Sequence, residues 1–130
     1  MRLSVSIKAW SWPVHEVLYK KFEELRLPIF GGNLSQEDIN NIYVGKRFSQ
    51  SDTLTPIVKT SALDSQSKDK LLNDLVLEHC GVVEEDLLSF MFKVQRLRDA
   101  SLAYIASKVA PAIVIAGNGH VRRDYGVPKY

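Results

Sequence analysis

The chain has 130 residues, of which 45% are hydrophobic and 25% charged, as is typical of a globular protein of one domain. Its net charge of +2 is too small to indicate nucleic acid as a partner, and no run of about 18 apolar residues predicts a membrane-spanning segment. The single cysteine, Cys80, excludes an internal disulfide, and the first residues lack a signal-peptide pattern. We expect a single domain over residues 1–130.

Three short segments have the hydrophobic patterns of strands. Residues 2–9 alternate between apolar and polar side chains, which predicts a half-buried strand, although an extended lead-in fits equally well. Residues 27–30 form an apolar run that ends at two glycines. Residues 112–116 are continuously apolar and follow Pro111, which predicts a buried strand.

Four other segments have helical patterns. The first follows Pro13 and ends near residue 26, because Pro28 disfavours helical geometry at the residue before it. The second begins at Ser35, an N-cap residue with Asp38 three positions on, and ends at Gly45. Residues 67–80 and 84–108 complete the set.

Residues 46–66 are rich in serine, threonine and lysine and contain Pro56. They predict a loop, with a short strand or turn at residues 55–59. Such a long connection is either a lid or binding loop, or simply a mobile surface segment.

Helices that alternate with apolar strands predict an α/β domain, with a small, mostly parallel sheet covered by helices. Only two of the strands are convincing, so the sheet is a poor core. The domain therefore either depends mainly on its helices or lacks strands.

The segment after the last predicted strand has the chemistry of a ligand site, because open α/β sheets bind ligands beyond the carboxyl ends of their strands. Its glycines permit a sharp turn, and His120 can bind a metal or accept a proton. Arg122 and Arg123 can bind carboxylates or phosphates, and Asp124 can orient the arginines or the histidine. A charged turn without function is the alternative. The spacing matches neither a phosphate-binding loop, nor a dinucleotide fingerprint, nor a zinc helix.

Three further groups of residues have alternative interpretations. His79 and Cys80 are either a metal-binding pair or the end of a helix with a small buried thiol. Arg96, Arg98 and Asp99 lie in the middle of a helix and form either a buried ion pair that positions the final loop or a solvated face. The tryptophans at positions 10 and 12 are either core or a stacking surface for a flat ligand.

Residues 116–128, AGNGHVRRDYGVP, resemble the C-terminal signature of the ChaN family of haem-binding, iron-regulated proteins. Further segments are similar to family motifs and occur in the same order, from about Trp10 onward. These segments are Trp10–Pro13, Gly32–Ser35, Glu78–Gly81 and Gln95–Ala100.

The resemblance implies a haem- or iron-associated binding protein that acts in iron uptake or haem handling. Haem is the implied cofactor, with tyrosine and histidine around the iron and a second subunit contributing. His120 is one expected metal ligand, and His15, which stands where the family often has tyrosine, is the other. The expected ligand-binding residues are Asn118, His120, Arg122, Arg123, Asp124 and Tyr125.

The chain departs from the family pattern at its N-terminal side, where the family's Glu/His motif is absent. We therefore expect an incomplete ChaN-like domain whose sheet exposes an edge, which favours a homodimer. The alternatives are a partial metal-dependent hydrolase with a divalent metal, or an inactive dimeric fragment. A lone histidine does not suffice for a catalytic zinc, so we expect binding rather than catalysis. Relatives are often periplasmic or membrane-anchored, and the compartment of this chain is left open.

Overall fold

The computed structural model describes residues 15–81 and 83–130, and every regular element within them is a helix. The elements in chain order are α1 (Glu16–Glu24), α2 (Gln36–Tyr43), α3 (Ser51–Thr60), α4 (Ser65–Glu78), α5 (Glu85–Lys108) and the short 3₁₀ helix η1 (Val127–Lys129). The predicted α/β class is therefore wrong, because the described part of the chain contains no strand and no sheet. None of its helices is long and apolar enough to cross a membrane.

The chain divides into two compact units, residues 1–31 and residues 32–130. The described part of the first unit consists of α1 and the segment after it. This confirms the helix predicted after Pro13, although none of the residues in α1 is buried. Arg26 has a left-handed φ of 52° directly after the helix, so the backbone turns there.

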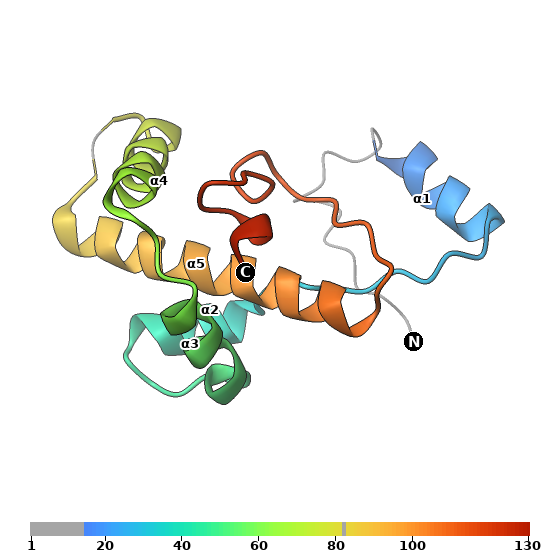
Figure 1. Cartoon of the computed structure of the whole chain (residues 1–130), viewed down its shortest axis with the longest axis horizontal. Coiled ribbons are helices and arrows are strands. Elements are labelled where there is room, and N and C mark those ends of the chain that lie inside the picture. The colour runs from blue at the N-terminus through green and yellow to red at the C-terminus, as the bar shows by residue number, and fades with distance from the viewer. Residues whose placement is uncertain (1–14, 82) are drawn as a thin grey trace. The chain divides into compact units, whose positions relative to one another are not determined.

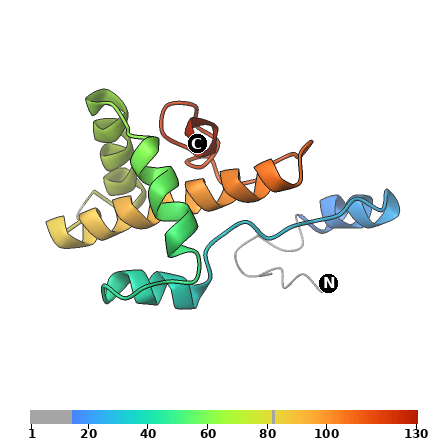
Figure 2. The same cartoon turned by 60° about the horizontal axis from the view of Figure 1, so that its bottom comes forward.

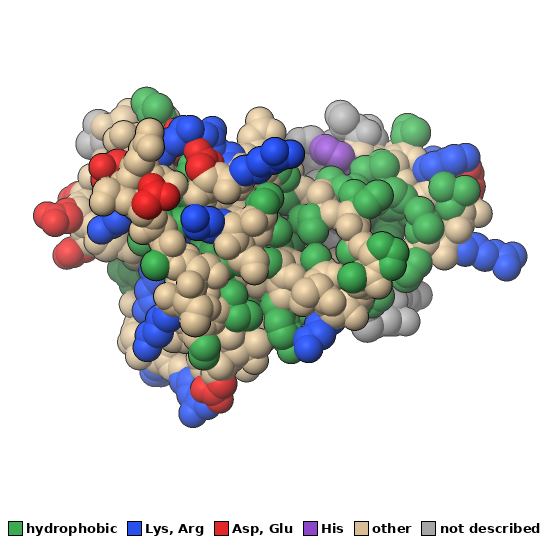
Figure 3. Space-filling model, viewed as in Figure 1, with side chains coloured by type: hydrophobic (Ala, Val, Ile, Leu, Met, Phe, Trp, Pro, Cys, Tyr) green, Lys and Arg blue, Asp and Glu red, His purple; other side chains and the backbone are tan. Residues whose placement is uncertain are grey.

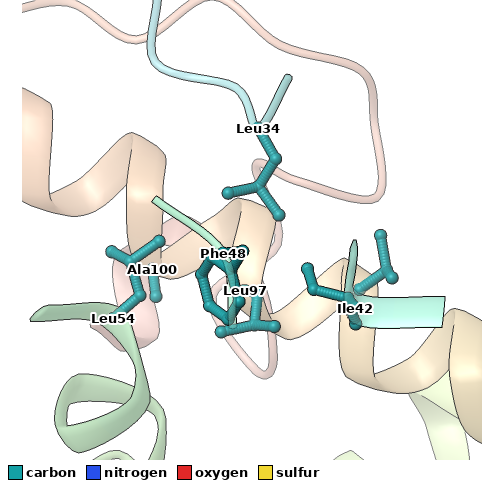
Figure 4. Close-up of a cluster of buried hydrophobic side chains, with 7 residues drawn as sticks. Leu34, Ile42, Phe48, Leu54, Leu97 and Ala100 are labelled. Carbon is teal, nitrogen blue, oxygen red and sulfur yellow. The ribbon is translucent and has the colours of Figure 1, made fainter. Parts of the chain in front are cut away.

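The second unit is arranged around α5, which contacts α2, α3, α4 and η1 (Figures 1 and 2). Its apolar side chains form two clusters. The larger cluster joins the α2 and α3 region to α5 and is shown in Figure 4. It contains Leu34, Ile42, Phe48, Leu54, Val94, Leu97 and Ala100. The smaller cluster places Tyr125, from the C-terminal loop, against Leu71 and Leu75 of α4.

The predicted start of α2 is confirmed. The Oγ of Ser35 accepts a hydrogen bond from the backbone N–H of Asp38 at 3.0 Å, and its hydroxyl donates to Oδ2 of Asp38 at 2.7 Å. The other oxygen, Oδ1, accepts from the backbone N–H and the hydroxyl of Ser49 at 2.9 and 2.8 Å. The backbone N–H of Ser49 is the largest cause that lowers the pKa of Asp38, followed by the Ser35 hydroxyl. Asp38 therefore fixes the loop after α2 as well as its first turn.

The predicted loop over residues 46–66 is wrong, because α3 occupies its centre. The short strand or turn expected at residues 55–59 is wrong for the same reason. Pro56 lies inside α3, where proline removes a hydrogen bond and disfavours a helix. Leu54 of α3 is fully buried against α5, so packing of this face outweighs the local cost of the proline.

Two of the predicted strands are irregular in the structure, and the third, residues 2–9, lies outside the described residues. Residues 27–30 and residues 112–116 form no regular element. A strand requires a neighbour that accepts and donates its backbone hydrogen bonds, and an apolar pattern alone does not provide one. Ile113 is 91% exposed and Phe30 is 46% exposed, so these runs are not buried as predicted.

Candidate functional site

The C-terminal loop carries His120 at its first turn. The backbone N–H of His120 donates to the carbonyl of Gly117 at 2.9 Å, and the carbonyl of His120 accepts from the N–H of Val127 at 2.7 Å. The loop closes on itself at Gly126, where a Cβ atom would lie 2.4 Å from the carbonyl oxygen of His120. Only glycine fits this close approach, so Gly126 fixes the backbone on which His120 stands.

The imidazole of His120 contacts the middle of α5. Its Nδ1 lies 2.6 Å from Oδ1 of Asp99 and 3.0 Å from Nε2 of Gln95. One ring nitrogen cannot donate to a carboxylate and accept from an amide at the same time. The shorter, charge-assisted contact favours Nδ1–H donating to Asp99. In this tautomer the lone pair is on Nε2, which has no hydrogen bond to the described residues.

Asp99 is completely buried, and its Oδ2 has no hydrogen-bond partner among the described residues. Burial raises the pKa of Asp99, while the hydrogen bond and charge of His120 and the charges of Arg96 and Arg98 oppose this rise. Burial also lowers the pKa of Arg98, whose Nε likewise lacks a partner in the described part. The site therefore holds one fixed carboxylate whose hydrogen bond is to His120.

Arg122 is engaged within the loop. Its guanidinium donates two hydrogen bonds to Asp124 at 3.0 and 2.7 Å, and Lys70 of α4 forms an ion pair with the same carboxylate at 2.8 Å. The Arg122 hydrogen bond is the largest cause that lowers the pKa of Asp124, and the Asp124 hydrogen bond is the largest that raises the pKa of Arg122. Asp124 thus orients an arginine and not the histidine. Arg123 and Asn118 are exposed, and Arg123 has no hydrogen bond or ion pair to the described residues.

Tyr125 anchors the loop to α4. Its side chain is 1% exposed, and its hydroxyl donates to Oδ2 of Asp74 at 2.5 Å. Burial, followed by the hydrogen bond to Asp74, raises the pKa of Tyr125. Arg122 covers the ring, with its guanidinium carbon 5.0 Å from the ring centroid. A ligand-binding role for Tyr125 stays a prediction, and the structure gives its hydroxyl a partner in Asp74.

The other predicted residues belong to other segments of the chain. His15 is at the start of α1, in the first unit, and the tryptophans at positions 10 and 12 lie outside the described residues. His79 ends α4, where its Nδ1 lies 2.8 Å from the carbonyl oxygen of Leu75, and Cys80 is exposed and not a small buried thiol. Over residues 15–81 and 83–130, no three histidine, cysteine, aspartate or glutamate side chains are grouped to hold a metal ion.

A family model described as haem-binding uptake, Tiki superfamily, ChaN matches residues 2–130. The chain belongs to the ChaN family. The resemblance predicted from the C-terminal signature is therefore confirmed. No curated protein and no solved structure matches the chain.

Several residues around the ChaN-family loop were not predicted as site residues. Gln95 contacts His120, while Asp74 and Lys70 of α4 hold the loop. Gln95 and Asp99 belong to the motif-like segment Gln95–Ala100, which was the one available signal. Asp74 and Lys70 lie in α4, and the sequence pattern of this segment indicated only an ordinary amphipathic helix.

Proposed function

We propose that this ChaN-family protein binds haem for uptake or handling, and that Nε2 of His120 is an axial ligand of the haem iron. The observation that supports this proposal best is the 2.6 Å contact between Nδ1 of His120 and the buried carboxylate of Asp99. Histidines that bind metals usually donate their other ring N–H to such a group, which fixes the tautomer and raises the basicity of the binding nitrogen.

The residues around His120 fit haem as the bound group. The side chain of His120 is 19% exposed, so the ring is mostly enclosed by the protein but not fully buried. Asp99 is on the rigid α5 and not on a loop, which reduces the entropy lost when the ring is ordered for binding. When bound, haem would supply an iron that accepts the Nε2 lone pair.

Recognition of the haem propionates is proposed for Arg123. Arg122 already donates both of its paired hydrogen bonds to Asp124. Arg123, three residues after His120, is exposed and has no partner among the described residues. Asn118, also exposed, can donate from its amide. The roles predicted for His15 and for a second subunit in holding the iron remain proposals without a geometric argument.

The hydrolase alternative has less support in the geometry. The pair formed by His120 and Asp99 can act as a general base, but a metal-dependent hydrolase needs further ligands, and the described residues group no three candidates. The proposed haem ligation uses one oriented imidazole of this chain, the ring of His120 held by Asp99.

Titration with hemin, followed in the visible spectrum, tests the proposal. We expect wild-type protein to give a saturable Soret shift that His120→Ala loses. His79→Ala is the matched control, because His79 is held by a backbone carbonyl at the end of α4. A Soret shift that is identical in wild type and His120→Ala would contradict the proposed ligand, and the absence of any shift would contradict haem binding.

A further inference from the structure

The first turn of the C-terminal loop has an Asn-Gly pair at its centre. Asn118 and Gly119 lie between the carbonyl of Gly117 and the backbone N–H of His120, which are joined by a hydrogen bond of 2.9 Å. The side chain of Asn118 is exposed, as is usual for a polar residue in a surface turn. The turn therefore presents to water an asparagine amide and the peptide nitrogen that follows it.

The peptide nitrogen of Gly119 is suited to attack that amide. No backbone carbonyl of the described residues accepts a hydrogen bond from its N–H. Glycine has no Cβ, so no side chain crowds this nitrogen as it approaches Cγ of Asn118 to close a five-membered ring. The fold does not require glycine here, because Gly119 lacks a left-handed φ and an added Cβ would meet only Nε2 of Gln95, at an ordinary 3.8 Å.

The other four asparagines of the chain occupy less reactive positions. Three of them lie inside α2 or α4, where the helical backbone angles keep the following nitrogen away from the side-chain carbon. Asn33 precedes Leu34, whose branched side chain is buried and crowds the nitrogen between them. Asn118 is thus the asparagine for which both the next residue and the local backbone favour ring closure.

We propose that Asn118 is a site of spontaneous deamidation, and that the isoaspartyl product releases His120 from Asp99. The nitrogen of Gly119 bonds to Cγ of Asn118, and the proton that it loses is returned through water to the side-chain amino group, which leaves as ammonia. Water then opens the succinimide ring. Cleavage of the bond between nitrogen and Cγ gives aspartate, and cleavage of the bond between nitrogen and the main-chain carbon gives isoaspartate. In sum, an amide and water become a carboxylate and ammonium.

Positive charge on the same loop favours the ring closure. Arg122 and Arg123 follow within five residues of Asn118, and Lys70 of α4 contacts the loop through Asp124. Figure 3, viewed as in Figure 1, shows lysine and arginine side chains over α4 and the C-terminal loop. The attacking nitrogen must lose its proton, and nearby positive charge stabilises the anionic form that results.

The isoaspartyl product lengthens the backbone of the turn. Its main chain runs through the former side chain, which adds one backbone atom between the carbonyl of Gly117 and the N–H of His120. The loop has little room for this change, because Gly126 already lies so close to the carbonyl oxygen of His120 that a Cβ would be 2.4 Å from it. The imidazole of His120 then loses its 2.6 Å contact with Oδ1 of Asp99. The resulting loss of haem rests on the proposed function, whereas the modification itself does not.

Peptide mass spectrometry tests the modification without haem. After incubation of the protein in warm, mildly alkaline buffer, we expect the peptide that contains Asn118 to gain the mass difference between an amide and a carboxylic acid. Peptides with Asn33 or Asn73 should not change. A protease that cleaves before aspartate but not before isoaspartate identifies the isoaspartyl fraction. Gly119→Ala should react at least about tenfold more slowly, because a Cβ crowds the attacking nitrogen. An unmodified Asn118 in wild type, or equal rates in both proteins, would overturn the proposal.

Nitrogen NMR of the histidine rings tests the consequence. The ring signals of His120 report its tautomer and its hydrogen bond to Asp99, so we expect them to change in isoaspartyl wild type and to remain in incubated Gly119→Ala. Unchanged signals in the isoaspartyl protein would refute the release of His120. In hemin titrations of the same samples, the Soret shift should fall in proportion to the isoaspartyl fraction. Fresh protein without a Soret shift would contradict haem binding alone, because the first two measurements involve no haem.

Discussion

The imidazole of His120 and the carboxylate of Asp99 meet at 2.6 Å although 21 residues separate them in the chain. One residue is on a loop closed by Gly126, and the other is completely buried on α5. This arrangement fixes which ring nitrogen carries the proton and leaves the other available for a ligand. The proposed function depends on this pair more than on any other contact in the protein.

Replacement of Asp99 by asparagine should weaken the site without removing its ligand. Loss of the negative charge makes Nε2 of His120 a poorer donor, so we expect ferric haem affinity to fall by about 10- to 100-fold and the reduction potential of bound haem to rise. Hemin titration and spectroelectrochemistry measure the two effects. The control is Asp86→Asn, at an exposed position in the first turn of α5. An unchanged potential would show that Asp99 does not act through the histidine.

Replacement of Tyr125 by phenylalanine tests the anchor between the loop and α4. The change removes the hydroxyl that donates to Asp74 and should lower the free energy of unfolding by about 1.5 kcal/mol. Urea denaturation measures this loss, and Tyr43→Phe, at a residue 69% exposed, should cost almost nothing. The Soret band of the haem complex should keep its position. A displaced band would instead indicate that Tyr125 binds the iron.

Arg96 links three parts of the second unit. It donates to the carbonyl oxygens of Val58 and Ser61 at the end of α3 and, through Nε at 2.7 Å, to the hydroxyl of Tyr130. Arg96→Met should destabilise the protein by about 3 kcal/mol, because partly buried acceptors lose a charged donor. Thermal and urea denaturation measure this cost. Lys93→Met, on the exposed side of the same helix, should leave stability almost unchanged; equal losses in both variants would refute the role of Arg96.

Asp38 should make stability depend on pH in the acid range. The pKa of its folded-state carboxyl is lowered below 3.8 by hydrogen bonds from Ser49 and Ser35. Its contribution is therefore complete above the unfolded pKa of about 4 and is lost as pH falls through the lower folded pKa. We expect Asp38→Asn to be about 2 kcal/mol less stable than wild type at pH 7, with a difference that shrinks below about pH 4. Denaturation at several pH values measures it, with Asp69→Asn as an exposed control. A difference that is constant with pH would contradict this account.

Local signals in the sequence predicted four of the five α-helices in the described residues, all except α3. The N-cap at Ser35 is confirmed, and the glycines after α2 and α4 adopt the left-handed φ values of 70° and 79° that end helices. These features depend on residues within one or two turns of each other, so the sequence alone contains the necessary information.

Pairing between distant segments was not predictable in this way. The apolar run at residues 112–116 fits a buried strand, but whether it forms one depends on a neighbour that no local pattern specifies. The opposite error occurred at α3, where Pro56 concealed a helix that is stabilised by burial of Leu54 against α5. In both places tertiary contacts decide the structure.

The candidate site was predictable in part. The glycines and charges around His120 marked the loop, and a positioning role was one of the two interpretations given for Arg96, Arg98 and Asp99. The partner of each side chain was not predictable, because Asp124, Asp74 and Asp99 are chemically equivalent carboxylates and only the fold assigns them to Arg122, Tyr125 and His120.

Rescue of a cavity variant by imidazole tests the central claim most directly. His120→Gly removes the proposed ligand and leaves Asp99 available to accept a hydrogen bond from an added imidazole. We predict that this variant fails to give the wild-type ferric haem spectrum, and that millimolar imidazole restores it in His120→Gly but much less in His120→Gly combined with Asp99→Asn. A wild-type spectrum in His120→Gly without imidazole would contradict the account.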